Sequence, residues 1–399
     1  MLNLKITEEQ RIAREQSRKW LARELEPHTD QLDRHEMLPY DLAKRFMREV
    51  QGVDQIETVE QLEEFHRHRD FLTSALIGIE VAKVCPGFAM ALGASFELCC
   101  YAILYAGTRE QKQQYALPLA RFDQIGCWAL TEPGAGSDIV SMKTFARKDG
   151  DHYILNGSKT FISNAPHADL LVVVAKTDKG FSQFILERGL AGLSTGAPLD
   201  KMGMRASPTG EIFLDGVRVH ERQRLGEDGK GLADAFAVLQ NERAKSPVMG
   251  IGIMERVLAE AVRYAKERVQ FNRPIIHFQG IQFMLARIWE AIQGSYAYLF
   301  MLGELKAQGL DITMPASAGK LYSTEEATRA ALDAIQILGG NGYMKEYKVE
   351  RFMRDAKLME IGAGTSQIQL MILARKLLEI PEPEFNPLFA GPDPFSEKP

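Results

Sequence analysis

The chain has 399 residues, of which 45% are hydrophobic and 25% are charged, and its formal net charge is −5. This composition is typical of a globular protein with two or three packed modules, and the acidic balance argues against a nucleic-acid partner, because phosphate binding usually needs a basic face. No CxxC pair occurs among the four cysteines, Cys85, Cys99, Cys100 and Cys127. We therefore expect buried thiols in a reducing compartment, with no disulfide scaffold and no metal site.

The first residues mix acidic side chains with apolar ones, which fits neither a signal peptide nor a transit peptide. No apolar run approaches the roughly 20 residues of a membrane-spanning helix. The sequence therefore predicts a cytoplasmic protein without a membrane partner. A mature mitochondrial matrix protein whose presequence has been removed would have the same features.

Residues 7 to about 122 are predicted to be helical. Thr7 and Gln10 form a candidate capping box, and Ile12, Trp20 and Leu21 recur on one face of the first helix. Further helices are expected at about 70–84, ending near Pro86-Gly87, and at about 88–106. These elements form the first predicted domain, residues 1–123.

From about residue 124 the pattern changes to short apolar stretches separated by turn residues. Asn156-Gly157 and Asp215-Gly216 each lie between two such stretches, which indicates tight hairpins, and residues 170–174 are typical of a buried strand. The spacing predicts a small antiparallel barrel or sandwich over residues 124–230.

The helical period returns from residue 231. One long helix is followed by helices at 279–308, 316–338 and 365–379, and four long helices with short links predict a bundle over residues 231–380. Pro247 is expected to disturb the first of these helices. The proline-rich tail at 381–399 is expected to be extended.

Two segments carry a strong family resemblance. Thr131–Asp138 reads TEPGAGSD, and Arg354–Gln367 reads RDAKLMEIGAGTSQ; together they resemble the acyl-CoA dehydrogenase flavoprotein family. The resemblance is close from about 104 to 380 and looser before that. It implies a mainly α fold with a central β-domain: an N-terminal helical domain, a small β-barrel or sandwich and a C-terminal four-helix bundle, with FAD between them. Read alone, the glycine-rich loop at 131–138 could also be a flexible link.

Most members of that family carry a catalytic glutamate where this chain has Ala363, whereas the isovaleryl-CoA and long-chain branches place the base on an earlier helix, at the position of Glu242. Removal of a weakly acidic α-proton needs a carboxylate in a dry pocket that raises its pKa. The resemblance therefore makes Glu242 the base, beside Arg243. It assigns stabilisation of the enolate to a flavin ribityl hydroxyl and the Ala363 amide.

Gly362 and Ala363 leave room beside the reacting carbons, which favours a branched, cyclic or otherwise wide acyl group over a long straight chain. Glu97 is the rival residue. It lies on the helix that lines the far end of the acyl pocket in relatives. It is either an exposed helix glutamate or a second acid/base group or contact for the acyl terminus.

The resemblance also implies a set of FAD contacts, in which Ser137 lies between the flavin and the pantetheine arm. Several of them reach the flavin of a neighbouring subunit, so a homodimer or homotetramer is expected. The predicted contacts are Trp128, Leu130, Thr131, Ser137, Phe161, Ser163, Arg268, Phe271, Gln336, Gly339, Gly340, Thr365 and Gln367.

The activity implied by the resemblance is α,β-dehydrogenation of an acyl-CoA thioester, with hydride transfer from the β-carbon to flavin N5 and electrons passed to an electron-transferring flavoprotein. The same fold can act as an enoyl-CoA reductase or on an acyl-carrier-protein thioester. A DNA-associated relative is disfavoured by the acidic charge, and acyl-CoA oxidases are usually longer than this chain. A purely non-catalytic binding role would require an empty flavin site, contrary to the motifs.

Overall fold

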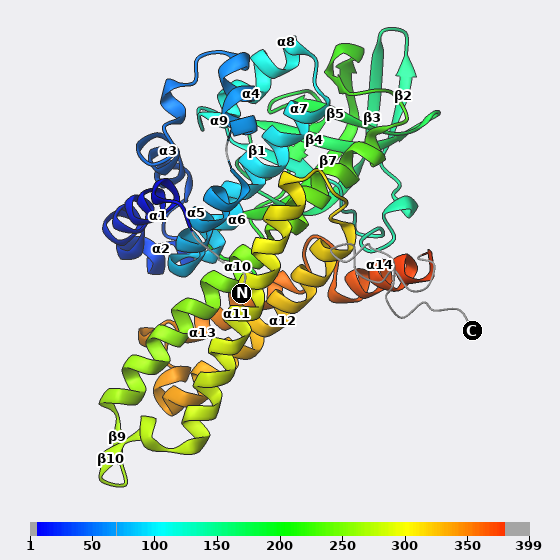
Figure 1. The fold of residues 1–399 in the computed structure, drawn as a ribbon. Helices are drawn as coiled ribbons and strands as arrows, with labels where there is room; N and C mark the ends of the chain where they lie inside the picture. The colour runs from blue at the N-terminus through cyan, green and yellow to red at the C-terminus, as the bar shows by residue number, and fades with distance from the viewer. Residues whose placement is uncertain (1–5, 69, 380–399) are drawn as a thin grey trace, which may run out of the picture.

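The computed structural model describes residues 6–68 and 70–379. Figure 1 shows short helices packed beside a β-sheet, and a bundle of long helices that projects away from both. The fold class expected from the sequence, mainly helical with a central β-domain, is confirmed. The predicted extended tail at 381–399 lies outside the described residues.

The amino-terminal part is helical, as expected, and the capping box at its start is confirmed. Thr7 Oγ1 accepts a hydrogen bond from the Gln10 amide, and Gln10 Oε1 accepts one from the Thr7 amide. Trp20 and Leu21 are buried, whereas Ile12, which was expected to share their face, is 44% exposed. The first helices are α1 (Glu8–Trp20), α2 (Thr29–Asp33), α3 (Tyr40–Glu49), α4 (Val59–His68) and α5 (Phe71–Val84).

A continuous helix follows from Pro86 to Ala106, built from α6 (Pro86–Gly93), a π-helical turn (Ala94–Cys100) and α7 (Tyr101–Ala106). By length and composition alone it could cross a membrane, so the expectation that no apolar stretch approaches that length was wrong. However, 56% of the most apolar part of this helix is buried inside the molecule, and the core helices of globular proteins can be equally long and apolar. Its apolar side chains pack in the protein core. The short helices α8 (Arg109–Gln111) and α9 (Leu117–Ala120) complete this part.

The described residues form an eight-stranded sheet with the order β6-β7-β3-β2-β4-β5-β8, and β1 pairs with β4. The expectation of a purely antiparallel domain was wrong, because β1 and β2 both pair with β4 in parallel. β4 is buried on both faces: Val172 packs against the amino-terminal helices and Val173 against the core of the β-domain. This explains its continuous apolar run. The strands are β1 (Gly126–Ala129), β2 (Phe145–Asp149), β3 (His152–Ser163), β4 (Leu170–Thr177), β5 (Gly180–Glu187), β6 (Leu193–Thr195), β7 (Thr209–His220) and β8 (Arg224–Leu225).

The two predicted hairpins were wrong. β3 and β7 run straight through Asn156-Gly157 and Asp215-Gly216 and pair with each other, with a register shift between Leu155 and Gly157. Asn156 Oδ1 accepts a hydrogen bond from the Gly216 amide at 2.8 Å, and Gly157, at φ 145°, has no room for a Cβ beside Thr144. The turn-forming residues therefore form a bulge within one long ladder.

The projecting bundle contains α10 (Gly231–Glu267), α11 (Gln279–Ala307) and α12 (Thr313–Leu338), with α13 (Val349–Met359) packed against it. α10 remains continuous through Pro247, so the expected disturbance is absent; only the helical hydrogen bond to the Arg243 carbonyl is lost. The hairpin of β9 (Val269–Gln270) and β10 (Arg273–Pro274) lies at the far end of the bundle. α14 (Ser366–Glu379) lies to one side (Figure 1).

Candidate active site

Glu242 lies on the first part of α10, where the bundle meets the rest of the molecule. Part of the residue remains accessible, but its Oε2 is buried and has no hydrogen-bond partner among the described residues. Burial raises the pKa of Glu242, and the charges of Lys320, Arg243 and Lys245 oppose that shift. A buried carboxylate with an unused oxygen is poised to accept a proton.

The turn between α13 and α14 lies directly beside this carboxylate. Arg243 Nε donates to the Ala363 carbonyl at 3.2 Å, and Lys320 Nζ donates to the Gly364 carbonyl at 2.6 Å. Ala363 has a left-handed backbone, with φ 54°, which is uncommon for a residue with a Cβ. The two cations therefore hold the turn in one conformation, and the structure brings Glu242, Arg243, Gly362 and Ala363 together.

The Ala363 amide and the Glu360 carboxylate, both close to this turn, differ in whether they form hydrogen bonds. The Ala363 N–H has no acceptor in the part of the chain that the structure describes. Glu360, in contrast, accepts hydrogen bonds from Thr328 Oγ1 at 2.5 Å and Lys357 Nζ at 2.8 Å. Of the carboxylates at positions 242 and 360, Glu242 is the one with an unpartnered oxygen.

Lys320 was missed by the sequence reasoning. Its side chain is fully buried, and burial, opposed by the charge of Glu242, lowers its pKa to about 8. The available signal was a lone lysine after the run of small residues Ala316–Gly319 in a helix. Only the fold shows that this lysine faces Glu242 and the 362–364 turn.

Glu97, the rival carboxylate, lies in the π-helical turn and is bonded to Lys245 Nζ at 2.6 Å. Lys245 follows Glu242 by three residues, so both project from one face of α10. Glu97 therefore contacts the face of α10 that carries Glu242, and its carboxylate accepts a hydrogen bond from a lysine.

A second group of predicted residues lies at the edge of the sheet. Trp128 and Leu130 are nearly buried, and the Thr131 carbonyl accepts a hydrogen bond from the Thr160 amide at 3.0 Å. Trp128 Nε1 donates to Gln183 Oε1 at 3.0 Å, which leaves Gln183 Nε2 buried without a partner. The end of β1 and the second half of β3 are thus adjacent.

Phe161 and the glycine-rich loop are exposed at this edge. The Phe161 ring is 69% exposed on a left-handed backbone, with φ 58°. Gly134 and Gly136 have open space where a Cβ would stand, and Ser137 is exposed beside them. An exposed aromatic ring, open backbone amides and a buried unpartnered amide fit a planar, hydrogen-bonding cofactor such as a flavin.

The remaining predicted cofactor residues are separated from that edge. Arg268 ends α10 at the far end of the bundle and lines an open cleft of about 320 Å³ together with Asn341. Phe271 is 88% exposed in the nearby hairpin, and Gly339 ends α12 at φ 60°. Within one chain the structure therefore separates two groups of predicted cofactor residues (Figure 1). The group at the bundle comprises Arg268, Phe271, Gln336, Gly339 and Gly340, and the group at the sheet edge comprises Trp128, Leu130, Thr131, Phe161 and Ser163. Thr365 and Gln367 lie at the start of α14, beside the 362–364 turn.

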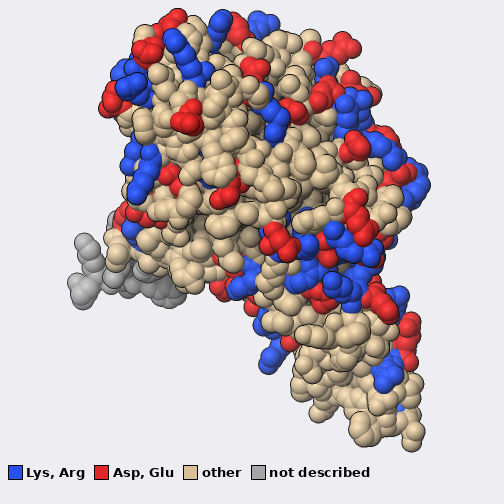
Figure 2. Space-filling model, turned by 180° about the vertical axis from the view of Figure 1, so that it is seen from behind, with Lys and Arg blue, Asp and Glu red and all other residues tan. Residues whose placement is uncertain are grey.

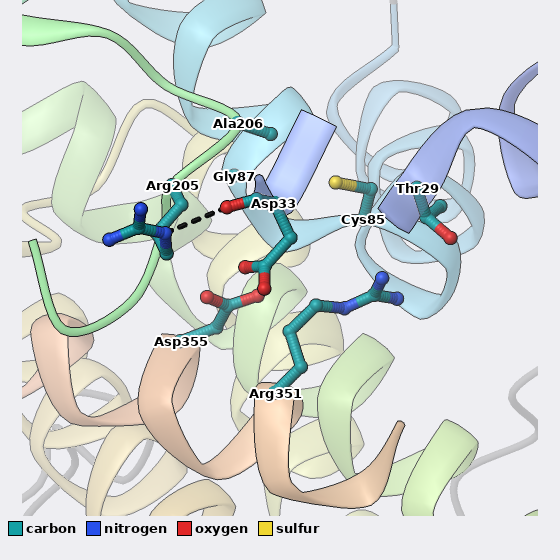
Figure 3. A pocket seen from close by; sticks show the side chains of 8 residues that line it. All are labelled: Thr29, Asp33, Cys85, Gly87, Arg205, Ala206, Arg351 and Asp355. Atoms are coloured by element: carbon teal, nitrogen blue, oxygen red, sulfur yellow. Dashed lines mark hydrogen bonds between the residues drawn. The ribbon is translucent and has the colours of Figure 1, made fainter. Parts of the chain in front are cut away.

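A different pocket is found where α2, the start of α6 and α13 meet (Figure 3). It holds no space for a water-sized molecule, and its wall includes Asp33, Arg351 and Asp355. It is a closed structural junction and lies outside the group formed around Glu242.

Comparison with known proteins finds one family along most of the chain. Models described as acyl-CoA dehydrogenase N-terminal, middle and C-terminal domains match residues 7–123, 127–217 and 229–378. The probable acyl-CoA dehydrogenase YngJ of Bacillus subtilis is 39% identical over 95% of this chain and 100% of its own length. The 3-(aryl)acrylate reductase of Clostridium sporogenes is 37% identical, covering 94% and 99%. The mitochondrial isovaleryl-CoA dehydrogenase of Solanum tuberosum is 38% identical, covering 88% and 86%.

Solved structures show the same similarity. Butyryl-CoA dehydrogenase from Megasphaera elsdenii superposes with a TM-score of 0.88 at 34% identity, covering 94% of this chain and 100% of that one. A glutaryl-CoA dehydrogenase from Mycobacterium smegmatis in complex with FADH2 gives a TM-score of 0.88 at 28% identity, covering 94% and 96%.

Proposed function

The chain belongs to the acyl-CoA dehydrogenase family of FAD-dependent oxidoreductases, and from this premise we propose that it carries out α,β-dehydrogenation of an acyl-CoA thioester with Glu242 as the base. The observation that carries the proposal is the buried, unpartnered Oε2 of Glu242 beside the 362–364 turn, which lacks the family's usual glutamate.

Each residue of the site has a definite task in this reaction. Glu242 Oε2 receives the α-proton of the thioester, and its raised pKa brings the carboxylate closer to the working pH of the enzyme. The free Ala363 N–H donates to the thioester carbonyl as negative charge develops there. Arg243 and Lys320 keep that amide in place by holding the neighbouring carbonyls. When bound, FAD supplies the electron acceptor.

The acyl group is proposed to be branched, cyclic or otherwise wide. A Cβ added at Gly362 would meet only the Leu358 carbonyl, at 3.6 Å, so open space lies beside the reacting carbons. The isovaleryl-CoA dehydrogenase of Solanum tuberosum, a relative at 38% identity, is consistent with a branched acyl group. A long straight chain is the second choice.

Family membership also supports an electron acceptor, an oligomeric state and a compartment for this enzyme. Electrons pass to an electron-transferring flavoprotein, and the enzyme works as a homodimer or homotetramer in the cytoplasm. The separation of Arg268 and Phe271 from the edge at Phe161 supports the oligomer, because a second chain is needed to bring both groups to one cofactor.

The alternative is the reverse reaction, reduction of an enoyl thioester, or action on an acyl-carrier-protein thioester. The similarity to the 3-(aryl)acrylate reductase of Clostridium sporogenes favours the reductase as the second candidate. Anaerobic mixing with saturated and unsaturated CoA esters separates the two directions: one bleaches the oxidised flavin and the other reoxidises the reduced flavin.

Glu242→Gln tests the proposal. Because the amide cannot take the α-proton, the rate of flavin bleaching by a saturated acyl-CoA should fall by about two to four orders of magnitude, while FAD stays bound. Glu360→Gln is the matched control in the adjacent turn and should retain rapid bleaching. Rapid bleaching by Glu242→Gln, lost instead in Glu97→Gln, would move the base to Glu97.

A further inference from the structure

A second charged cluster lies one helical turn beyond Glu242. Lys245 Nζ donates to Glu97 Oε2 at 2.6 Å, and both side chains are 24% exposed. Glu97 is the one charged residue in the helix Pro86–Ala106, and it stands in the π-helical turn, a feature that is frequent at functional sites. We name Glu97, Lys245 and Lys306 the acyl-end cluster.

Lys306 reaches the same place from α11. Its Nζ donates to Asn241 Oδ1 at 2.6 Å, on the turn of α10 that carries Glu242, and lies 5.1 Å from the centre of the Phe71 ring. Burial, and then the charge of Lys245, lowers the pKa of Lys306 to about 8, while Glu97 opposes the shift. Lys306 is thus mainly protonated at neutral pH, close to a second cation.

The charges of the acyl-end cluster do not balance. Two ammonium groups face one carboxylate, and each ammonium has three N–H donors, of which one is used in a hydrogen bond to another described residue. An ion pair that merely joined two helices would need one cation. A second, partly buried cation beside it costs free energy unless an anion accompanies it.

The short distance between the cluster and Glu242 limits the length of an acyl chain that could carry such an anion. Three residues of α-helix separate Lys245 from Glu242, which corresponds to about 4.5 Å along the axis. A group at Lys245 is therefore only a few bonds from a carbon whose proton Glu242 removes. An alkyl group in that place would desolvate the two lysine ammonium groups without forming a compensating hydrogen bond or ion pair.

We propose that the substrate's acyl group ends in a carboxylate that Lys245 and Lys306 bind, so that the enzyme acts on short dicarboxylic acyl thioesters. Glu97 is a positioning residue that holds Lys245. This inference rests on the proposed function and adds the chemistry of the acyl terminus; the open space at Gly362 accommodates a branch in addition.

The test compares glutaryl-CoA with pentanoyl-CoA, which have the same number of acyl carbons and differ in the terminal group. With the FAD-loaded wild-type protein and an artificial electron acceptor, kcat/KM for glutaryl-CoA should exceed that for pentanoyl-CoA at least about tenfold, a difference of about 1.4 kcal/mol. Lys245→Met and Lys306→Met should each reduce or reverse this preference, mainly through KM for glutaryl-CoA. Glu97→Gln should weaken it less.

Lys179→Met, on the exposed β4–β5 turn, is the control for loss of a lysine and should leave the preference unchanged. An equal or greater kcat/KM for pentanoyl-CoA in the wild-type protein would overturn the carboxylate proposal and leave the dehydrogenase function standing. Absence of flavin bleaching with either ester, and with branched and cyclic esters, would sink the dehydrogenase function itself. The wild-type comparison decides even where a lysine variant does not fold.

Discussion

At the scale of single residues, the loop at 131–138 depends on a buried ion pair. Lys159 and Glu132 are 0% and 6% exposed, and Lys159 Nζ donates to Glu132 Oε1 at 2.8 Å and to the Leu130 carbonyl at 2.9 Å. Burial by itself would raise the pKa of Glu132, but hydrogen bonds from Lys159, Thr144 and Lys143 outweigh it and the pKa is lowered. The pair joins β3 to the start of the loop that carries the predicted flavin contacts.

Lys159→Met should destabilise the protein by about 3–5 kcal/mol, because Glu132 remains buried without its cation. The apparent Tm from calorimetry at a fixed scan rate, read together with the FAD content of the purified protein, checks this. The double variant Lys159→Met/Glu132→Gln removes the orphaned charge and should recover part of the loss. Equal Tm values for the single and double variants would contradict the explanation.

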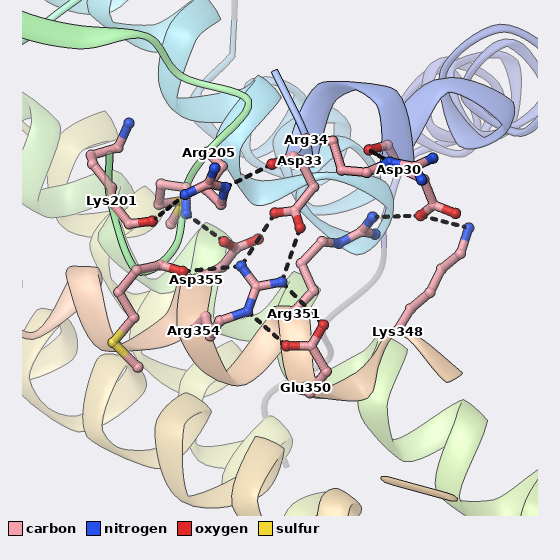
Figure 4. A network of polar contacts seen from close by, with 12 residues as sticks. Asp30, Asp33, Arg34, Lys201, Arg205, Lys348, Glu350, Arg351, Arg354 and Asp355 are labelled. Carbon is pink, nitrogen blue, oxygen red and sulfur yellow. Dashed lines mark hydrogen bonds and ion pairs between the residues drawn. The ribbon is translucent and has the colours of Figure 1, made fainter. Parts of the chain in front are cut away.

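At the scale of elements, one polar network ties α13 to the amino-terminal helices and to the loop before β7 (Figure 4). Arg354 pairs with Asp33 at 3.0 Å and donates to the Met202 carbonyl at 3.0 Å. Asp355 Oδ1 accepts a hydrogen bond from the Met204 amide at 2.5 Å, and Arg205 Nε donates to the Asp33 carbonyl at 2.7 Å. This network positions α13, and with it the turn that carries Ala363.

Asp355 makes the network sensitive to pH. Burial raises its pKa to about 6, partly opposed by the Met204 amide and Arg351, whereas an unfolded aspartate titrates near about 3.9. The folded state therefore holds this proton more tightly. The corresponding stability is full below about pH 4 and is lost as pH rises through about 6, a change of up to about 3 kcal/mol.

Asp355→Asn keeps an acceptor for the Met204 amide but does not ionise. Its apparent Tm relative to the wild type should therefore improve between pH 4.5 and pH 7, by an amount that corresponds to at most about 3 kcal/mol. Thermal melts of both proteins in matched buffers across that range measure it. A Tm difference that stays constant with pH would show that Asp355 is ionised throughout.

At the scale of the whole molecule, the bundle projects far from the sheet and carries exposed apolar side chains. Figure 2 shows its projecting end largely without charged residues on that face. The large apolar residues exposed at this end include Val269, Phe271, Phe283, Trp289 and Tyr343. Exposed apolar surface of this kind marks an interaction site, in agreement with the proposed oligomer.

Phe271→Asp should weaken the association of subunits and lower the FAD content, because it places a charge in the apolar hairpin proposed to reach the neighbouring chain's cofactor. Sedimentation velocity gives the assembly state, and the ratio of flavin to protein absorbance gives the occupancy. Glu346→Gln, an exposed change nearby, is the control. If the Phe271→Asp protein assembled fully and bound its full complement of FAD, Phe271 would not be part of the interface.

Sequence alone determined the family, the fold class, the amino-terminal cap and the buried strand β4, because short motifs, side-chain capping and apolar periodicity act within a few residues along the chain. It misjudged Asn156-Gly157 and Asp215-Gly216, because pairing of β3 with β7 outweighs a local turn preference. It also misjudged Pro247, whose helix is held on several sides by packing.

Tertiary structure alone decided which distant charge lies near Glu242 and which residues make up the acyl-end cluster. Lys320 acts on Glu242 from α12, whereas Lys306 from α11 and Glu97 from the helix before the sheet lie near Lys245, and no spacing along the chain relates them. Charge and burial act through space, so the pKa of a carboxylate and the balance of the acyl-end cluster depend on which helices pack together. The motifs indicated the chemistry; the packing of distant helices set its electrostatics.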